Sequence, residues 1–317
     1  YFQPYIAGKC DIESAGAWQI QAEDNYAYIS ESGYGRFEAF DISNPESPSS
    51  IGFVRPTLSG GSGLYGFDII DNYAVVANEE HNLSLIDLSS PDDLSVEVDC
   101  YSDSDYYIAK NLIINDDYLY ASGEFYGLQI LDISNTSNII SVFNEGYDGD
   151  RSYSAIAKNG SKVFLSGYYF SDDIRTGRFS IYDITQKSVP VKLASVDLPG
   201  EFSHDIFISN GYAYIANGSA GLQIIDISNL DNPEIIGSIS TQWDTRRIEI
   251  EDNIAYVCNV YQNIGGICVY DVSNPMDPVF IKKIEEIAYS RTIDLKNNYA
   301  YTIDGNTGML NIIKISL

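Results

Sequence analysis

Four side chains suited to proton transfer or anion binding recur at nearly regular intervals from residue 153 onward: Tyr153, His204, Arg246 and Arg291. β-Elimination of an acidic polysaccharide requires this combination, because arginine can neutralise the uronate carboxylate while tyrosine or histidine moves a proton. Without proton transfer, the same set would bind an anionic or carbohydrate-like ligand. His204 as an ordinary core or pocket residue is the alternative for that position.

These intervals belong to a repeat that runs through the whole chain. Seven copies of an apolar segment are present: FEAFDIS (37–43), LSLIDLS (83–89), LQILDIS (128–134), FSIYDIT (179–185), LQIIDIS (222–228), ICVYDVS (267–273) and LNIIKIS (310–316). The fifth residue of each segment serves as its marker: Asp41, Asp87, Asp132, Asp183, Asp226, Asp271 and Lys314, at spacings of 46, 45, 51, 43, 45 and 43. A period of this length is typical of propellers and solenoids.

Each repeat has the pattern of four short strands. In the fifth copy, 206–209 and 211–216 flank a tight turn, 222–228 is the apolar segment, and 233–239 follows a turn with Asn and Pro. No convincing helical period occurs. The sequence therefore predicts an all-β fold whose four-stranded blades start near residues 17, 65, 110, 153, 204, 246 and 291.

The two ends of the chain complement one another. The seventh repeat stops after its third strand, whereas residues 4–10 resemble 233–239, with Pro and Gly at the same separation. Residues 1–12 are therefore predicted to supply the outer strand of the last blade and to protect its edge. This favours a closed seven-bladed β-propeller, a single domain over 1–317, rather than a solenoid, which would need capping ends.

The repeat resembles the LVIVD repeat family of bacterial and archaeal cell-surface proteins. The resemblance rests on the segment GLQIIDIS (221–228), the Asn-Pro turn after it and the strand AYIA before it, and it extends over nearly the whole chain. It implies a propeller and an extracellular or cell-surface setting. It supplies no catalytic motif, so an enzyme is not the expected outcome.

Alignment of the first strands on their hairpin turns places one set of aromatic and cationic residues at equivalent positions: Trp18, Tyr65, Lys110, Tyr153, His204, Arg246 and Arg291. With Arg247, they are expected to line the top face, the side of the propeller on which loops join one blade to the next. Aromatic rings stack on sugars, and guanidinium groups bind anions. This face is the candidate site for an anionic glycan or a partner protein.

A structural role for the arginines is the competing interpretation. All eight lie in or beside segments expected at the top, where they could pair with acids and hold blades together: Glu31, Glu79, Glu80, Asp205 and Asp244. If every arginine were paired in this way, the protein would be an interaction scaffold without a ligand pocket.

Charge and composition restrict the partners. With 18 Lys and Arg against 45 Asp and Glu, the net charge is −27, which excludes ordinary nucleic-acid binding through a basic face. No apolar run is long enough to span a membrane, and a monomer is expected. No cofactor is expected, but Asp103, Asp105, Asp148 and Asp150 alternate in two loops and could offer oxygen ligands to calcium, with solvated turns as the alternative.

Two further features leave alternatives open. Cys258 and Cys268 flank one hairpin, so they could form a cross-strand disulfide or remain buried thiols. The fourth repeat carries an insert at 167–178, whose three consecutive aromatic residues, Tyr168, Tyr169 and Phe170, suggest contact with a partner.

Overall fold

The computed structural model describes residues 3–12, 16–56, 63–79, 82–100, 108–147, 149–171, 174–241, 243–261 and 264–315. These residues form 28 β-strands. No helix that could cross a membrane is found among them. The chain divides into two compact units, Tyr1–Ser102 with Val260–Ile267 and Lys283–Leu317, and Asp103–Asn259 with Cys268–Lys282.

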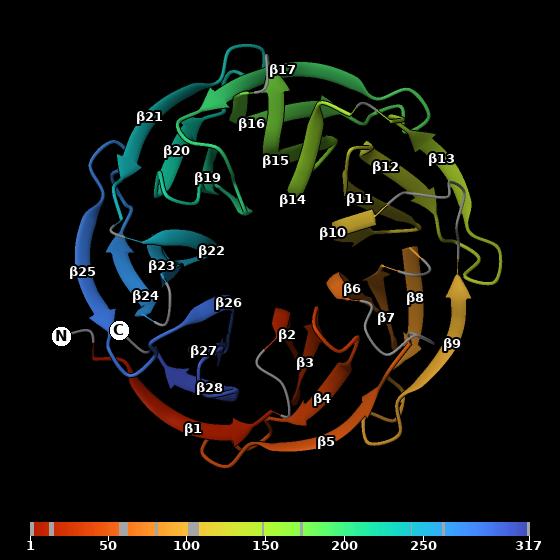
Figure 1. Ribbon diagram of the computed structural model, residues 1–317, viewed down its shortest axis with the longest axis vertical. Helices are drawn as coiled ribbons and strands as arrows, with labels where there is room; N and C mark the ends of the chain where they lie inside the picture. Colours follow the sequence, from red (N-terminus) through yellow and green to blue (C-terminus); the bar gives the residue numbers. More distant parts are fainter. Residues whose placement is uncertain are drawn as a thin grey trace. The chain divides into compact units, whose positions relative to one another are not determined.

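The first unit contains three four-stranded antiparallel sheets (Figure 1). One sheet consists of β2 (Ala17–Glu23), β3 (Tyr26–Glu31), β4 (Phe37–Asp41) and β5 (Ser49–Val54). The next consists of β6 (Leu64–Ile70), β7 (Tyr73–Asn78), β8 (Asn82–Asp87) and β9 (Ser95–Cys100). The third has the order β1-β28-β27-β26, formed by β1 (Tyr5–Asp11), β26 (Ser290–Lys296), β27 (Tyr299–Asp304) and β28 (Met309–Lys314).

The second unit begins with an eight-stranded sheet, in which two meanders of four strands meet at the pair Glu124 and Ser152. Its strands are β10 (Ile108–Asn115), β11 (Tyr118–Glu124), β12 (Gly127–Asp132), β13 (Ile140–Asn144), β14 (Arg151–Asn159), β15 (Lys162–Ser171), β16 (Ile174–Asp183) and β17 (Val191–Leu198).

Two four-stranded sheets follow the eight-stranded one. The first consists of β18 (Asp205–Ser209), β19 (Tyr212–Ala216), β20 (Leu222–Asp226) and β21 (Glu234–Ile239). The second consists of β22 (Asp244–Glu251), β23 (Ile254–Tyr261), β24 (Ile264–Asp271) and β25 (Val279–Ile284). These two sheets each follow the strand order predicted from one repeat.

The predicted N-terminal strand is present. β1 pairs antiparallel with β28, from Tyr5 opposite Lys314 to Asp11 opposite Met309. It lies on the outer side of β28, so it adds the fourth strand to the sheet of the seventh repeat (Figure 1).

The repeated aspartates stabilise turns. Each accepts a hydrogen bond from the backbone N–H two residues later, at 2.8–3.0 Å, as seen for Asp41, Asp87, Asp132, Asp183, Asp226 and Asp271. Hydrogen bonds from the side-chain hydroxyl and the backbone N–H of that Ser or Thr residue together lower the pKa of all six carboxyls. The aspartates therefore belong to the scaffold, as their presence in successive repeats suggests.

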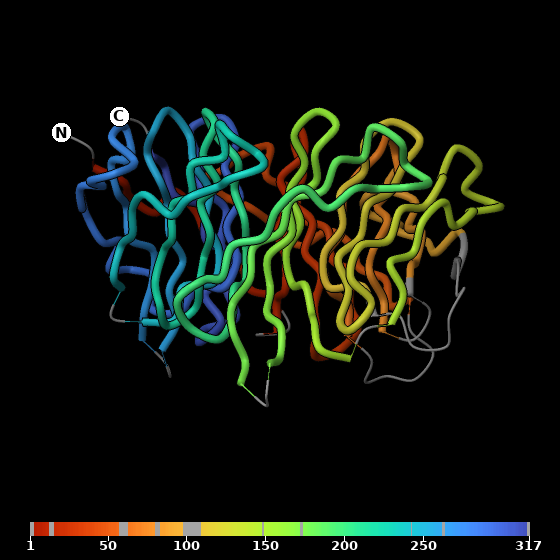
Figure 2. The backbone as a smooth tube through the Cα atoms, turned by 90° about the horizontal axis from the view of Figure 1, so that it is seen from above, coloured from red at the N-terminus to blue at the C-terminus, as the bar shows by residue number. Residues whose placement is uncertain are grey.

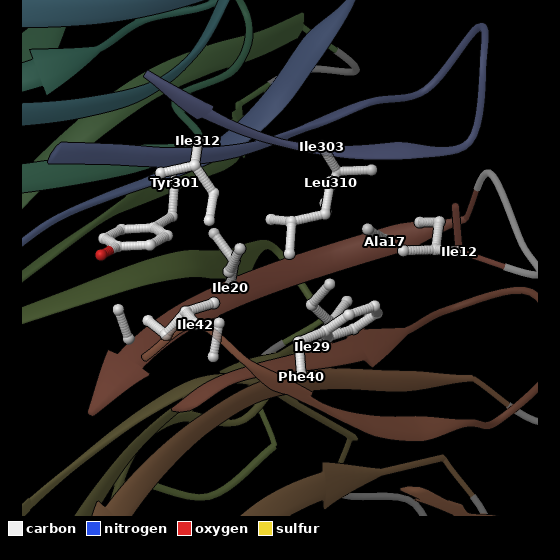
Figure 3. Close-up of a cluster of buried hydrophobic side chains, with 12 residues drawn as sticks. Ile12, Ala17, Ile20, Ile29, Phe40, Ile42, Tyr301, Ile303, Leu310 and Ile312 are labelled. Carbon is white, nitrogen blue, oxygen red and sulfur yellow. The ribbon is translucent and has the colours of Figure 1, made fainter. Parts of the chain in front are cut away.

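Apolar side chains from adjacent sheets form the core. In the first unit, Ile20, Ile29 and Phe40 pack with Ile303 and Leu310 (Figure 3). Because these residues come from β2, β3, β4, β27 and β28, the cluster joins two sheets that are far apart in sequence. A comparable cluster in the second unit joins the sheets of β14–β17 and β18–β21.

A second kind of contact between neighbouring sheets explains the glycine of the outer strand. A Cβ on Gly237 would lie less than 3 Å from the carbonyl oxygen of Pro275 in the following turn. Gly8 and Gly52 face Pro45 and Pro91 in the same way. The outer strand of one sheet therefore packs against the Asn-Pro or Ser-Pro turn of the next, and only glycine leaves room.

Replacement of Gly237 with valine is expected to lower the free energy of unfolding by about 1–3 kcal/mol, because the side chain must push the turn at Pro275 away. Urea unfolding measures the loss. Gly33→Val is the matched control, since no atom lies within 4 Å of a Cβ at that exposed turn. Equal stability of the two variants would contradict the proposed packing constraint.

The insert of the fourth repeat lengthens a hairpin. β15 and β16 have ten residues each, and their pairing continues to Ser171 opposite Ile174. The hairpin extends beyond the neighbouring strands of its sheet (Figure 2).

Candidate functional site

A β-bulge sets the position predicted for the aromatic and cationic residues. Pairing of the first strand skips Trp18 and Lys110, and it skips two residues that include Tyr65 and two that include Arg291. Bulges at strand ends re-aim a side chain away from the sheet. These four residues therefore occupy equivalent positions in their strands, and their role in ligand binding stays a prediction.

Tyr153 is the exception, and its predicted placement is wrong. The bulge of β14 falls between Tyr153 and Ala155, so Ser154 occupies the equivalent position. Tyr153 lies six residues before Asn159, the last paired residue of its strand. The residues aligned with it, such as Trp18 and Lys110, lie five residues before the corresponding position. Its side chain is 1% exposed, and its hydroxyl is 3.0 Å from Ser180 Oγ. Tyr153 thus packs in the core, and the lyase interpretation loses its proposed tyrosine.

Three residues of the predicted set, Trp18, Tyr65 and Arg291, belong to the first unit. Trp18 and Tyr65 make an edge-to-face pair with ring centroids 5.0 Å apart. Arg291 is exposed, and its Nε donates a hydrogen bond to Tyr289 Oη at 2.9 Å.

Within the part of the chain that the structure describes, five of the eight arginines pair with carboxylates, as the structural interpretation predicts. The partners are Glu38 for Arg36 (2.9 Å), Glu145 for Arg151 (3.0 Å), Asp197 for Arg178 (2.6 Å), Asp205 for Arg247 (3.2 Å) and Asp244 for Arg246. Lys110 likewise pairs with Glu124 at 3.1 Å. Of the predicted acids, Asp205 and Asp244 fill this role, whereas Glu80 lies outside the described residues. The cationic positions are therefore largely neutralised.

A pocket of about 710 Å³ lies in the second unit. Its lining residues are Gly200, Glu201, Phe202, His204, Gly218, Ser219, Asp244 and Arg246. Asp244 and Arg246 are two residues apart on β22, so their side chains leave the strand on the same face. Gly218 has a φ of 54°, and a Cβ there would lie 3.0 Å from Asp244 Oδ1. Glycine at this turn therefore keeps the pocket open.

Three polar side chains make a closed set within the pocket. Asp244 Oδ2 pairs with Arg246 Nη2, Asp244 Oδ1 lies 3.6 Å from His204 Nε2, and Arg246 Nη1 lies 3.4 Å from His204 Nδ1. Burial lowers the pKa of His204 below its ordinary value, although Asp244 opposes this effect. Burial would raise the pKa of Asp244, but His204 and Arg246 outweigh it and hold that pKa low. At neutral pH the set therefore contains a neutral imidazole and a charge-balanced Asp–Arg pair.

The long hairpin supports one wall of the pocket. The Phe202 ring stacks on His204, with an interplanar angle of 7° and centroids 6.3 Å apart. The Arg175 guanidinium lies 4.2 Å from the Phe202 centroid, 4.5 Å from that of Tyr168 and 5.0 Å from that of Phe170. Tyr168 and Phe170 of the insert thus pack around Arg175 beside the pocket wall. The third aromatic residue, Tyr169, has the Arg178 guanidinium 3.6 Å from its ring centroid. The partner contact expected for the insert stays a prediction.

The other candidates are resolved differently. Asp103, Asp105 and Asp148 lie outside the described residues, and Asp150 is exposed. Within the described part of the chain, no group of three or more His, Cys, Asp or Glu residues could hold a metal ion. Cys258 and Cys268 are both buried thiols, so the thiol alternative holds for this pair.

Sequence reasoning missed half of the pocket. Gly200, Glu201, Gly218 and Ser219 were not expected to be site residues, because they lie in connections whose course depends on neighbouring sheets. A signal existed for Asp244, since Asp-Thr-Arg at the start of a strand places acid and guanidinium on one face.

Comparisons with known proteins agree with this fold. The LVIVD repeat matches residues 15–55, 108–145, 202–241 and 244–285, about half of the chain. No curated protein matches the sequence. The β-propeller domain of Cps50 (Swd1) from Myceliophteria thermophila is similar in structure, with a TM-score of 0.74, 10% identity and coverage of 99% of this chain and 100% of that domain.

Two further solved structures are similar. A chain of the Mitotic Checkpoint Complex has a TM-score of 0.76 at 8% identity, covering 100% of this chain and 97% of that one. The computationally designed Ika8 protein has a TM-score of 0.64 at 11% identity, covering 96% and 99%. At such identities these likenesses establish a β-propeller fold and nothing about function.

Proposed function

Because the chain belongs to the LVIVD repeat family, we propose that it is an extracellular or cell-surface binding protein that takes a carbohydrate-like or anionic ligand in the pocket of His204, Asp244 and Arg246. In this proposal, residues 1–317 form a single seven-bladed propeller, which β1 closes. A partner protein that docks on the same surface is the alternative occupant.

The pocket is the observation that carries the proposal. It combines a volume of about 710 Å³ with convergent polar groups, the usual character of a ligand site. Its imidazole, carboxylate and guanidinium hold one another in place, so little side-chain entropy remains to be lost on binding.

The proposal predicts that Arg246→Ala abolishes ligand-induced stabilisation. A thermal-shift screen of neutral and acidic oligosaccharides against the unmodified protein identifies the ligand, since a ligand at about 100 times its Kd stabilises by about 2.7 kcal/mol. The expected result is a shift that disappears in the variant, through loss of a guanidinium donor within the pocket.

Arg178→Ala is the matched control, because Arg178 also pairs with an aspartate but does not line the pocket. A shift that survives Arg246→Ala and disappears in Arg178→Ala would place the site on the long hairpin instead. The absence of any shift would refute a glycan ligand and direct the search to a partner protein.

A further inference from the structure

The charge balance of the pocket restricts its ligand further than its shape does. Asp244 neutralises Arg246, and burial keeps His204 neutral at physiological pH. Glu201, which is exposed at the pocket, adds a second carboxylate to the lining. The Arg246 guanidinium is the one cationic group among the lining residues at that pH, and Asp244 already binds it on one side. The lining as a whole is therefore slightly acidic.

We infer that the pocket selects an uncharged, hydroxyl-rich ligand, a neutral oligosaccharide, and that Asp244 determines this specificity by occupying the guanidinium that would otherwise bind a carboxylate. The inference rests on the proposed function, since it concerns the ligand class of that same pocket.

Sugar hydroxyls match the available groups. A hydroxyl can donate to Asp244 or Glu201 and at the same time accept from Arg246 or Ser219. Asp244 and Arg246 retain 30% and 33% of their side-chain surface, so both have atoms within reach of a ligand. A neutral polyol can therefore satisfy donors and acceptors together without introducing an unpaired charge.

A carboxylate does not match them. To bind Arg246, it must either displace Asp244 or lie beside it, and each arrangement leaves carboxylates close together in a partly desolvated pocket. Like charges in such a position are strongly unfavourable. The Arg175 guanidinium, 4.2 Å from the Phe202 centroid, is not among the groups that line the pocket.

The test compares uronate oligosaccharides with their carboxyl-reduced counterparts, which have the same linkages but no charge. Dissociation constants are measured by calorimetry for the unmodified protein, Asp244→Asn and Asp231→Asn. Asp231 is an exposed residue of the same unit, so its variant makes the same change in net charge outside the pocket.

The expected result is that the unmodified protein binds the neutral member at least about tenfold more tightly, and that Asp244→Asn moves this ratio at least about tenfold toward the uronate. Asp231→Asn should leave the ratio unchanged. If Asp244→Asn fails to fold, Glu201→Gln gives an independent reading, because removing the neighbouring charge should narrow the preference several-fold.

Three outcomes would overturn the inference. A preference of the unmodified protein for the uronate would reject the specificity rule while the proposed function stands. Equal responses of the Asp244 and Asp231 variants would assign the discrimination to the net charge of −27 rather than to the pocket. Failure of every oligosaccharide pair to bind any of the proteins would reject the proposed glycan function, and the inference with it.

Discussion

Replacement of Asp205 with alanine is expected to lower the free energy of unfolding by about 3–5 kcal/mol. Asp205 is 8% exposed, and its carboxylate accepts hydrogen bonds from Arg247 Nη1 at 3.2 Å and from the backbone N–H of Ile248 at 3.0 Å. It therefore joins the sheet of β18 to that of β22. Alanine would leave the largely buried Arg247 guanidinium and the buried N–H of Ile248 without this acceptor. Removal of one partner is costly because the other polar group stays buried without its hydrogen bond.

Urea unfolding at neutral pH measures this loss. Asp231→Ala, at an exposed turn of the same unit, is the control and should change stability by less than about 0.5 kcal/mol. The double variant Asp205→Leu/Arg247→Met should recover most of the loss, because apolar residues of similar size need no partner. A loss below about 1 kcal/mol for Asp205→Ala would show that the ion pair does not hold these sheets together.

The second large effect is a pH dependence at Asp294. This residue accepts a hydrogen bond from the backbone N–H of Ala22 at 2.6 Å, and burial raises its pKa from 3.8 to about 6, against the opposing effects of that hydrogen bond and of Lys296. The unfolded chain therefore loses this proton near pH 4, whereas the folded protein retains it up to about pH 6. Between these values the stability contributed by Asp294 falls as the pH rises.

The variant Asp294→Asn is expected to lose this dependence. As the pH rises from 4 to 7, its free energy of unfolding should increase by about 2 kcal/mol relative to that of the unmodified protein. Altered hydrogen bonds would add a difference that does not depend on pH. Because Asp294 is partly exposed, this change in the free energy of unfolding is smaller than it would be for a fully buried carboxyl. Chemical unfolding at intervals across this range tests it. A difference that stays constant with pH would mean that Asp294 ionises normally in the folded protein.

Local rules made most of the strand pattern predictable. The repeated aspartates mark turns, and residues such as Asp24 and Asn210 adopt the positive φ that tight hairpins need. The N-terminal strand could be recognised because residues 4–10 carry the same Pro and Gly as residues 233–239. The structure then supplies the reason for that glycine, which is the backbone of the next turn rather than any property of the strand itself.

The site was less accessible to sequence reasoning, for two physical reasons. A shift of one residue moves a side chain to the other face of a strand, and Tyr153 lies one residue further from its hairpin turn than the residues aligned with it, so Ser154 holds the equivalent position. Pairing between charges also depends on distances across strands. The eight arginines were visible in the sequence, but their neutralisation by residues such as Glu145 and Asp197 was not.

The pairing of β1 with β28 has a consequence for biosynthesis. Of the 28 strands, β1 is the first to leave the ribosome and its partner β28 is the last. The sheet that contains both therefore cannot be completed while the chain is still being translated, and β1 must wait without its partner. Contacts between such distant segments form slowly, and unpaired edges invite association with other chains. A nascent chain of this design is most vulnerable to aggregation just before its final strand is released.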